Sequence, residues 1–333
     1  MELITVSANE AGQRLDKLLG KFLREAPKSF LYKMMRKKNI TLNGKKVQGN
    51  EILGEGDEIK LFFSEETLQK FKGSAPKAAA LPKTKLNIVY EDENIVLIDK
   101  PAGMLSQKAN PQDVSLVEYL ISYLLESGSI TEKELMSFRP AVCNRLDRNT
   151  SGLVIAGKSL VGLQTMSSML KDRSMRKYYR CVVKGTMQGS QHLCGYLMKD
   201  ERTNKVRIEK TIAGKSKEME DAKPIETEYR ALASANGLTL LEVHLITGRS
   251  HQIRAHLASI GHPILGDMKY GDAGVNEKYR RSHKVTHQML HAYRLEMPEI
   301  EGKLSYFSGK TFTAPMPKVY EKLVPMRENG ANA

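Results

Sequence analysis

A stretch rich in lysine, alanine and proline, residues 65–85, divides the chain and limits the folds open to it. It holds few large apolar residues and shows no alternation that would predict a strand. We therefore interpret it as a flexible linker between a small unit, residues 1–64, and a larger unit, residues 86–325. Residues 326–333 form a polar tail that we expect to be disordered. At 333 residues, the chain is long enough for two cores.

The charge balance indicates a polyanionic partner. The formal net charge is +14, whereas a hydrophobic content of 41% is ordinary for a globular protein. A basic excess of this size favours nucleic acid first and an anionic membrane surface second. The alternative is a basic surface that only keeps the chain soluble.

The sequence shows no signal for membrane insertion or secretion. No stretch is long and apolar enough to cross a bilayer, and the start lacks the basic and apolar regions of a secretory signal. Cys143, Cys181 and Cys194 are widely spaced, which fits a reducing compartment, and they show no C-x-x-C metal pattern. His283 and His287 lie four apart, but no third ligand follows at a recognisable spacing. We expect a cytoplasmic protein with no metal site and no membrane partner.

The small unit predicts two short helices followed by strands. Apolar residues recur at helical spacing between Arg14 and Leu23, and Ser29 is a candidate N-cap for the second helix. The pair Asn43-Gly44 is a strong signal for a hairpin between two short strands.

Basic side chains concentrate between the second helix and the hairpin. Six Lys or Arg and no acid occur from Lys33 to Lys46. This one-sided charge suits contact with a phosphate backbone, and a solvated helix face is the alternative. The candidate RNA contacts are Lys33, Arg36, Lys37 and Lys38. The order of these features, from Arg14-Leu15-Asp16-Lys17 to Gly56-Asp57-Glu58-Ile59-Lys60-Leu61, resembles the S4 RNA-binding domain.

The larger unit alternates strands and helices without a strict βαβα rhythm. Its apolar patterns predict helices over residues 115–125 and 160–170, and strands over residues 95–98, 152–157, 178–183 and 238–246. Many strands with a few helices predict an α+β domain around a mixed or antiparallel sheet.

One carboxylate, Asp147, lies between two arginines in the run Asn144-Arg145-Leu146-Asp147-Arg148-Asn149-Thr150-Ser151-Gly152. Neighbouring positive charge favours the ionised form of an acid. An ionised Asp near a turn can act as a nucleophile, as a base or as one half of a structural ion pair. The motif by itself leaves all three open.

Three further segments carry polar side chains suited to a shared site. Tyr179 lies in a predicted strand and faces opposite to its neighbours. Residues 245–257 are dense in hydrogen-bond donors after an apolar strand, and His251 and Arg254 would share one face of a helix that begins there. The fourth segment is His262-Pro263-Ile264-Leu265-Gly266-Asp267. Taken singly, each also has a structural interpretation as a cap, a bridge or a strand aromatic.

Together, the four segments resemble the RluA-like pseudouridine synthases. The signature of that family is His-Arg-Leu-Asp-x-x-Thr-Ser-Gly, then Lys-x-Tyr, then Gly-Arg-Thr-His-Gln-Ile-Arg-x-His, then Gly-His-Pro-x-x-Gly-Asp. The resemblance spans about residues 86–317. Asn144 replaces the usual His and Ser250 replaces the usual Thr, and both keep hydrogen-bonding capacity.

The resemblance implies isomerisation of uridine in RNA to pseudouridine, with no metal and no cofactor. It implies that Asp147 is the essential carboxylate, either as a nucleophile or as a group that stabilises and deprotonates. Arg254 would hold it through a bidentate ion pair. Tyr179 would lie against the target uracil or sugar, as a stacking platform and a candidate general base.

The same resemblance implies RNA contacts around this acid. The target uridine must leave its helix before Asp147 can reach it. Arg145 would fill the vacated space or contact a phosphate, and Arg249 and His251 would hold phosphates.

The expected partner is structured RNA, with 23S (large-subunit) ribosomal RNA first and transfer RNA second, and the expected state is a monomer. A non-catalytic, ribosome-associated RNA-binding protein is the main alternative, because charge and the S4-like unit fit it equally well. It does not explain why Asp147, Tyr179 and Arg254 all lie in matched motifs. A nucleic-acid hydrolase would need a second acid or a metal cluster, which these motifs lack.

Overall fold

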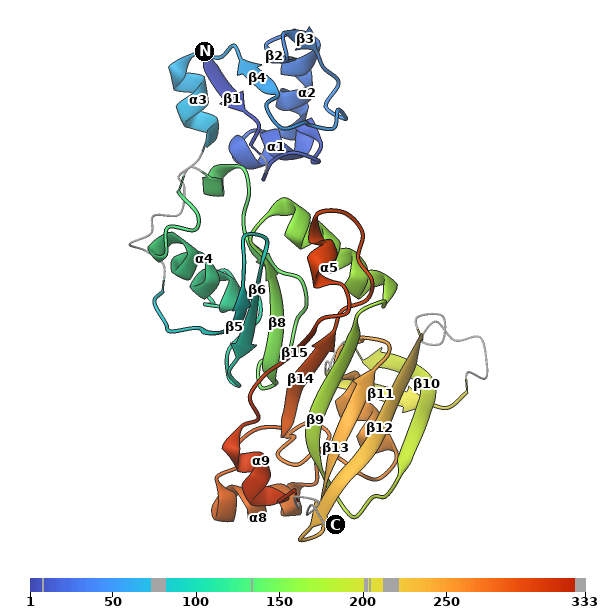
Figure 1. Cartoon of the computed structure of the whole chain (residues 1–333). Helices are drawn as coiled ribbons and strands as arrows, with labels where there is room; N and C mark the ends of the chain where they lie inside the picture. The colour runs from blue at the N-terminus through green and yellow to red at the C-terminus, as the bar shows by residue number, and fades with distance from the viewer. Residues whose placement is uncertain are drawn as a thin grey trace.

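The structure, a computed structural model, describes residues 1–326 except 8, 73–81, 133, 201–202, 204 and 212–221. Within this part of the chain the strands form two separate sheets, one of four strands and one of eleven (Figure 1). None of the helices described there combines the length and the hydropathy that a bilayer crossing requires.

The smaller sheet belongs to the N-terminal unit, drawn in blue in Figure 1. Its strand order is β1-β4-β2-β3, with every pair antiparallel. The elements are β1 (Glu2–Thr5), α1 (Leu15–Phe22), α2 (Lys28–Arg36), β2 (Ile40–Leu42), β3 (Lys45–Lys46), β4 (Glu58–Leu61) and α3 (Glu65–Lys72). The predicted hairpin is confirmed: Asn43 and Gly44 have φ values of 49° and 73°, the left-handed pair that a two-residue type I′ turn requires.

Two predictions for this unit are wrong. Helix α2 begins at Lys28, so Ser29 lies inside the helix and does not cap it. Pro27, with φ −58°, precedes that start, and proline suits this position because it has no N–H to satisfy. The linker does not begin at residue 65, because helix α3 buries Leu68 in the N-terminal core. Residues 73–81 of the predicted linker and residues 327–333 of the predicted tail lie outside the described residues.

The larger unit is an α+β domain around a mixed sheet, as predicted. The strand order is β11-β10-β12-β13-β9-β14-β8-β6-β5; β8 and β14 pair in parallel, and the other neighbours pair antiparallel. The strands are β5 (Asn87–Glu91), β6 (Ile95–Lys100), β7 (Ala141–Val142), β8 (Ser151–Gly157), β9 (Arg176–Lys184), β10 (Ser190–Asp200), β11 (Lys205–Glu209), β12 (Lys223–Ala235), β13 (Leu238–Leu245), β14 (Leu290–Glu296) and β15 (Thr311–Thr313). The helices are α4 (Leu116–Glu126), η2 (Glu134–Met136), α5 (Leu160–Asp172), α7 (Gln252–Ser259), α8 (Ala273–His283), η3 (Gly302–Phe307) and α9 (Lys318–Leu323).

Both faces of the sheet are covered at the β6–β8 end. Successive side chains of a strand point to opposite faces, so Val96 and Ile98 of β6 join the core that contains α4. Ile95 and Leu97 point the other way, into a second core with α5 and η3. This double burial explains why β6 is a nearly continuous apolar run.

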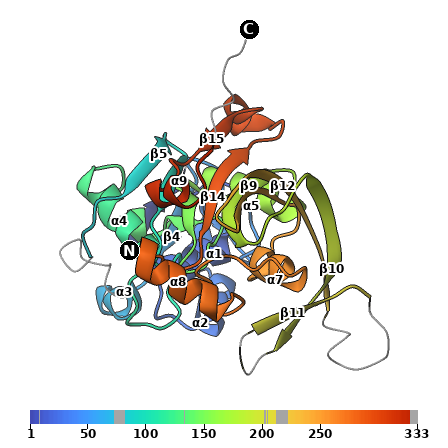
Figure 2. The same cartoon turned by 90° about the horizontal axis from the view of Figure 1, so that it is seen from below.

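At the other end of the sheet, the helices of the described residues cover one face only. Helix α7 lies beside β12 and β11, and its Ile253 and Leu257 enter the main core (Figure 2). The opposite, outer face carries polar side chains: Tyr178 of β9 stacks on His244 of β13 with ring centroids 4.8 Å apart. The sheet thus presents one face that α7 covers, which holds the candidate site, and an outer face that no described helix covers.

Two buried histidines predict a loss of stability in acid. Burial lowers the pKa of His256 on α7 to about 4, and that of His291 on β14 to about 4. The unfolded chain regains an ordinary histidine pKa near 6.5, so below that pH it binds more protons than the folded chain. The free energy of unfolding is therefore highest above pH 6.5. It decreases as the pH drops toward 4, by on the order of 2 kcal/mol per histidine.

Urea denaturation at a series of pH values measures this effect. We expect His256→Gln to reduce the slope of stability against pH between 6.5 and 4, whereas His283→Gln, at an exposed position, leaves the slope unchanged. A free energy of unfolding that stays constant across this window would contradict the assignment.

Candidate active site

A cleft of about 830 Å³ collects the residues that the sequence analysis assigned to one site. Its lining includes Asp147, Tyr179, Arg254, Arg145, Arg249 and His251. Tyr179 lines it while its neighbour Tyr178 lies on the outer face, as strand alternation predicted. The four basic residues of the N-terminal unit do not line this cleft and are exposed on α2 or just after it: Lys33, Arg36, Lys37 and Lys38.

Asp147 begins a tight turn that is fixed to strand β14. The amide of Thr150 donates to the carbonyl of Asp147 at 3.0 Å, and the hydroxyl of Ser151 lies 2.8 Å from Nδ1 of His291. Gly152 has φ +107°, and a Cβ there would collide with the backbone of β14 where it pairs in parallel with β8. The Thr-Ser-Gly part of the motif therefore positions the acid.

Asn144, the residue that departs from the family pattern, has a clear structural role. Its side-chain nitrogen donates to the carbonyl of Leu153 at 3.2 Å, and its side-chain oxygen accepts from the amide of Ile155 at 2.8 Å. Both partners lie on β8, so the side chain joins the motif to the strand that follows it.

Lys100 supports the Asp147 turn from behind, and the sequence analysis did not select it. Its side chain is fully buried. Nζ donates to the carbonyls of Pro101, Met104 and Arg148 at 3.0, 2.9 and 3.2 Å. Burial lowers the pKa of Lys100 to about 8, against the opposing charge of Asp147. The available signal was a lysine at the end of an apolar strand, directly before Pro-Ala-Gly.

Arg254 of α7 joins two carboxylates. Its Nη1 donates to Oδ2 of Asp147 at 2.7 Å. Its Nε and Nη2 donate to the two oxygens of Asp267 at 2.7 and 2.9 Å. The predicted bidentate pair with Asp147 is therefore wrong: the bidentate partner is Asp267, and Asp147 receives a single bond. The planar guanidinium offers its Nε–Nη2 edge to one carboxylate only, and Asp267 occupies that edge.

The two carboxylates differ in their access to solvent. The side chain of Asp267 is 0% exposed, and it also accepts from the amides of Lys269 and Tyr270. The side chain of Asp147 is 30% exposed in the cleft. Burial raises the pKa of Asp267, but its bonds to Arg254 outweigh burial and lower it overall. Burial likewise lowers the pKa of Arg254, and Asp267 and Asp147 together raise it above its usual range.

His251 and Tyr179 complete the surroundings of Asp147. His251 Nε2 lies 3.9 Å from Asp147 Oδ2, and His251 Nδ1 lies 2.9 Å from the hydroxyl of Tyr270. Burial lowers the pKa of His251 despite the nearby acid, which favours a neutral ring at pH 7. Burial and then the charge of Asp147 raise the pKa of Tyr179 well above its usual range. A phenol that keeps its proton is suited to stacking and hydrogen-bond donation rather than to base catalysis.

Gln252, which the sequence analysis missed, organises the loop before α7. It is buried, and its Oε1 accepts from the hydroxyl of Thr247 and the amide of Arg249 at 2.9 and 3.1 Å. Its Nε2 donates to the carbonyl of Glu226 on β12 at 2.9 Å. These bonds tie helix α7 to the sheet.

The remainder of the cleft is strongly basic. Arg145 is exposed, and no described residue bonds its guanidinium. Asp147 is the sole acid among the described residues that line the cleft, and it faces seven basic ones: Lys108, Arg145, Lys171, Arg173, Lys177, Arg249 and Arg254. A concave basic surface around one partly exposed carboxylate suits a phosphate-bearing substrate.

Comparison with known proteins identifies the class. A model described as RNA pseudouridylate synthase matches residues 94–259, and a model of the S4 domain matches residues 13–59. An uncharacterized RNA pseudouridine synthase of Mycoplasma genitalium is 31% identical over 89% of this chain and 89% of its own length. Ribosomal large subunit pseudouridine synthase C of Vibrio vulnificus is 29% identical over 97% of this chain and 96% of its own. The chain therefore belongs to the RluA-like RNA pseudouridine synthases and is an isomerase of that family.

Solved structures share the fold of the catalytic part. Human RNA pseudouridylate synthase domain containing 4 aligns with a TM-score of 0.54 and 21% identity, covering 70% of this chain and 90% of its own. Human RNA pseudouridylate synthase domain containing 1 aligns with a TM-score of 0.50, covering 72% and 94%. At this identity the likeness concerns the fold alone, and it agrees with the predicted α+β class.

Removing the buried partner of Arg254 should destabilise the protein. Asp267→Asn leaves a guanidinium that is 9% exposed without its bidentate carboxylate, which costs about 3 kcal/mol. Urea denaturation at pH 7 measures the loss. Glu321→Gln, at an exposed position, is the control and should change stability by less than about 0.5 kcal/mol. A loss below about 1 kcal/mol in Asp267→Asn would contradict the structural role of this pair.

Proposed function

We propose that this enzyme converts uridine to pseudouridine in large-subunit ribosomal RNA and that Asp147 is the essential carboxylate. The observation that carries the proposal is the bond between Arg254 and Asp147, which leaves one carboxylate oxygen open to the cleft. Arg254 bonds Oδ2, and Oδ1 accepts no hydrogen bond from the described residues. An ionised, partly exposed acid held by a fixed cation is what either a nucleophile or a base requires.

The reaction exchanges one bond to the sugar for another. The bond from ribose C1′ to uracil N1 breaks, the uracil turns, and C5 bonds to C1′ while its proton leaves and N1 regains one. Asp147 acts as a nucleophile on the ribose or uracil, or it stabilises and deprotonates along a glycal route. Arg254 donates to Asp147 during these steps, and the buried Lys100 bonds the carbonyl of Arg148 behind it.

The target uridine has to leave its RNA helix to enter the cleft. The ring of Tyr179, with its proton retained, then packs against the uracil or sugar. Arg145, which is exposed and has no described protein partner, fills the vacated stack or contacts a phosphate. Arg249 contacts phosphates at the rim, and His251 lies beside Asp147 as a neutral ring whose Nδ1 is hydrogen-bonded to Tyr270.

The choice of ribosomal RNA rests on two observations. Relatives of Vibrio vulnificus and Escherichia coli that bear the name ribosomal large subunit pseudouridine synthase C match over 97% and 82% of this chain. The N-terminal unit also matches the S4 domain and exposes its basic residues. Transfer RNA is the second candidate. We further propose that residues 1–64 act as an RNA-binding domain and that the enzyme works as a cytoplasmic monomer.

A pseudouridine map of total RNA tests the choice of substrate. We expect a strain that lacks this gene to lose pseudouridine at one or a few discrete positions of large-subunit ribosomal RNA. Reintroducing the gene should restore the same positions. Loss confined to transfer RNA would move the assignment to the second candidate, and an unchanged map would overturn the proposal.

Neutralising the basic residues near α2 tests the role of the S4 unit. The fourfold alanine variant at Lys33, Arg36, Lys37 and Lys38 should bind ribosomal RNA fragments more weakly. The slope of log affinity against log salt should fall by about 3, because each phosphate contact contributes somewhat less than one unit. The rate of pseudouridine formation from bound RNA should be unchanged, since none of the four lines the cleft.

A matched control removes the same charge elsewhere. Alanine at four exposed lysines of the C-terminal part should leave the salt slope unchanged: Lys303, Lys310, Lys318 and Lys322. Equal slopes in the two fourfold variants would show that net charge, rather than the S4 surface, determines binding.

A further inference from the structure

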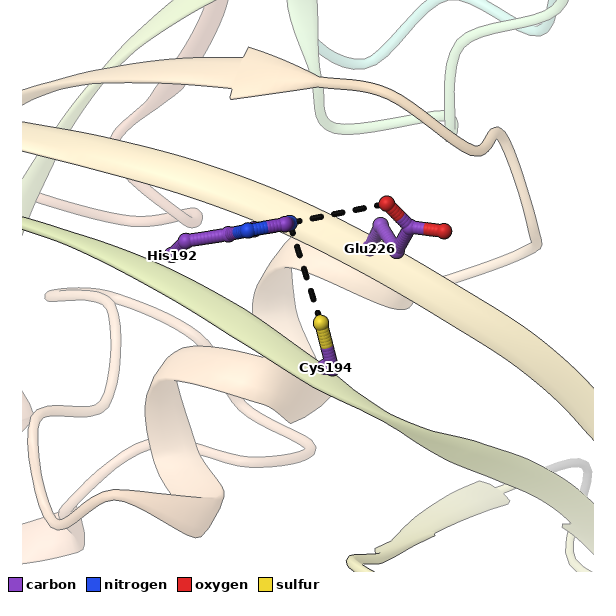
Figure 3. Close-up of side chains that lie close together, drawn as sticks. All are labelled: His192, Cys194 and Glu226. Carbon is purple, nitrogen blue, oxygen red and sulfur yellow. Dashed lines mark hydrogen bonds and ion pairs between the residues drawn. The ribbon is translucent and has the colours of Figure 1, made fainter.

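Three side chains of the types that ligate metals meet on the outer face of the sheet, away from the cleft that holds Asp147. His192 and Cys194 lie on β10, and Glu226 lies on the neighbouring strand β12 (Figure 3). Cys194 is paired directly with Glu226 in the antiparallel register, and His192 is two residues from Cys194. A spacing of two keeps both side chains on one face, so the register alone brings the three together.

This face is opposite to the one that forms the cleft. His192 pairs across β12 with Glu228, Glu228 pairs with His244, and His244 pairs with Tyr178. Directly paired residues share a face, and Tyr178 alternates with Tyr179, which lines the cleft. The cluster is therefore separate from the residues proposed for catalysis, and a ligand bound to it would be independent of the proposed function.

Two of the three separations between donor atoms are close to those of a zinc site. Nε2 of His192 is 3.7 Å from Sγ of Cys194 and 3.5 Å from Oε2 of Glu226, and the three donor atoms all lie within 4.8 Å of one another. Zinc bonds of about 2.3 Å to sulfur and about 2.0–2.1 Å to nitrogen and oxygen, at tetrahedral angles, separate such donors by about 3.4–3.6 Å. Binding needs small side-chain movements and no change in the strands.

We propose that His192, Cys194 and Glu226 bind one zinc ion, with water in the fourth position. Thiolate and imidazole favour zinc over magnesium and calcium, which prefer oxygen ligands only. Binding exchanges the thiol proton of Cys194 for the metal and releases it to solvent. His192 and Glu226 are 47% and 45% exposed, and Cys194 is exposed, so the ion can enter from water.

A purely structural role explains these three side chains less well than metal binding does. Without a metal, His192 and Glu226 form an exposed contact of 3.5 Å, and exposed contacts of this kind contribute little to stability. This contact also leaves the thiol of Cys194 with no role beyond its own contact to the imidazole. A metal uses all three donors at once.

The site lies on the strands that support helix α7. The carbonyl of Glu226 accepts from Gln252 of α7, and Nδ1 of the buried His256 of α7 lies 3.1 Å from the hydroxyl of Thr227, the next residue of β12. Arg254 lies between these two residues on the same helix. The zinc ion would therefore crosslink β10 and β12 directly beneath α7.

Cobalt substitution tests the site on the full-length, tag-free protein kept reduced. We expect one Co²⁺ per chain, with a thiolate-to-cobalt charge-transfer band and tetrahedral d–d bands, both removed by one equivalent of Zn²⁺. Cys194→Ser should abolish the charge-transfer band. His192→Ala and Glu226→Gln should weaken binding about tenfold or more.

Two variants serve as controls. Cys143→Ser removes a different thiol and His283→Ala a distant exposed imidazole, and both should bind cobalt as the parent does. Denaturation of each variant in the absence of metal confirms that it folds, and Cys194→Ala replaces Cys194→Ser where the serine variant does not. No saturable binding at micromolar cobalt, or a charge-transfer band that survives the loss of Cys194, would overturn the proposal.

Discussion

The guanidinium of Arg254, shared between Asp147 and Asp267, is the contact on which the rest of this structure depends. It joins a turn before β8, a helix after β13 and a loop before α8. Because Asp267 is fully buried and Arg254 nearly so, neither charge is tolerable without the other. The mixed sheet brings these three segments together. The buried pair of Arg254 and Asp267 then determines the position of Asp147, because Arg254 also donates to it.

Asp147 and Asp267 differ in burial and therefore in role. Asp267 has its oxygens occupied by Arg254 and two backbone amides, which makes it structural. Asp147 accepts one bond from Arg254 and keeps the rest of its carboxylate toward a basic cleft. Lys100 adds a second buried cation behind the turn, through bonds to three carbonyls. Asp147 therefore has two cations nearby, Arg254 and Lys100, but neither occupies both of its carboxylate oxygens.

The sequence predicted correctly those features that depend on residues close together along the chain. The Asn43-Gly44 turn, helices α4 and α5, and the alternation that points Tyr179 into the cleft were all predictable, because turn chemistry and side-chain period determine them. The motifs also brought Asp147 and Arg254 into one site. The errors at Ser29 and at helix α3 concern element ends, where burial against the rest of the unit decides the boundary.

Contacts between distant segments were not predictable from the sequence alone. The sequence motif that ends at Asp267 could be recognised. That Asp267 is the bidentate partner of Arg254, however, depends on how α7 packs against the loop that follows it. Lys100 gave a weak signal, since lysine is rarely fully buried. The meeting of Cys194 with Glu226 depends on a strand register that the sequence does not reveal.

A single-turnover assay of Asp147→Asn shows whether Asp147 is the reacting carboxylate. The substrate is ribosomal RNA carrying tritium at uridine C5, and release of tritium reports formation of the new carbon–carbon bond. The variant keeps the shape of the side chain and its acceptor for Arg254 but not its charge. We expect no release of tritium above background while RNA binding stays within a few-fold of the parent. Turnover by the folded variant would show that another group carries the reaction.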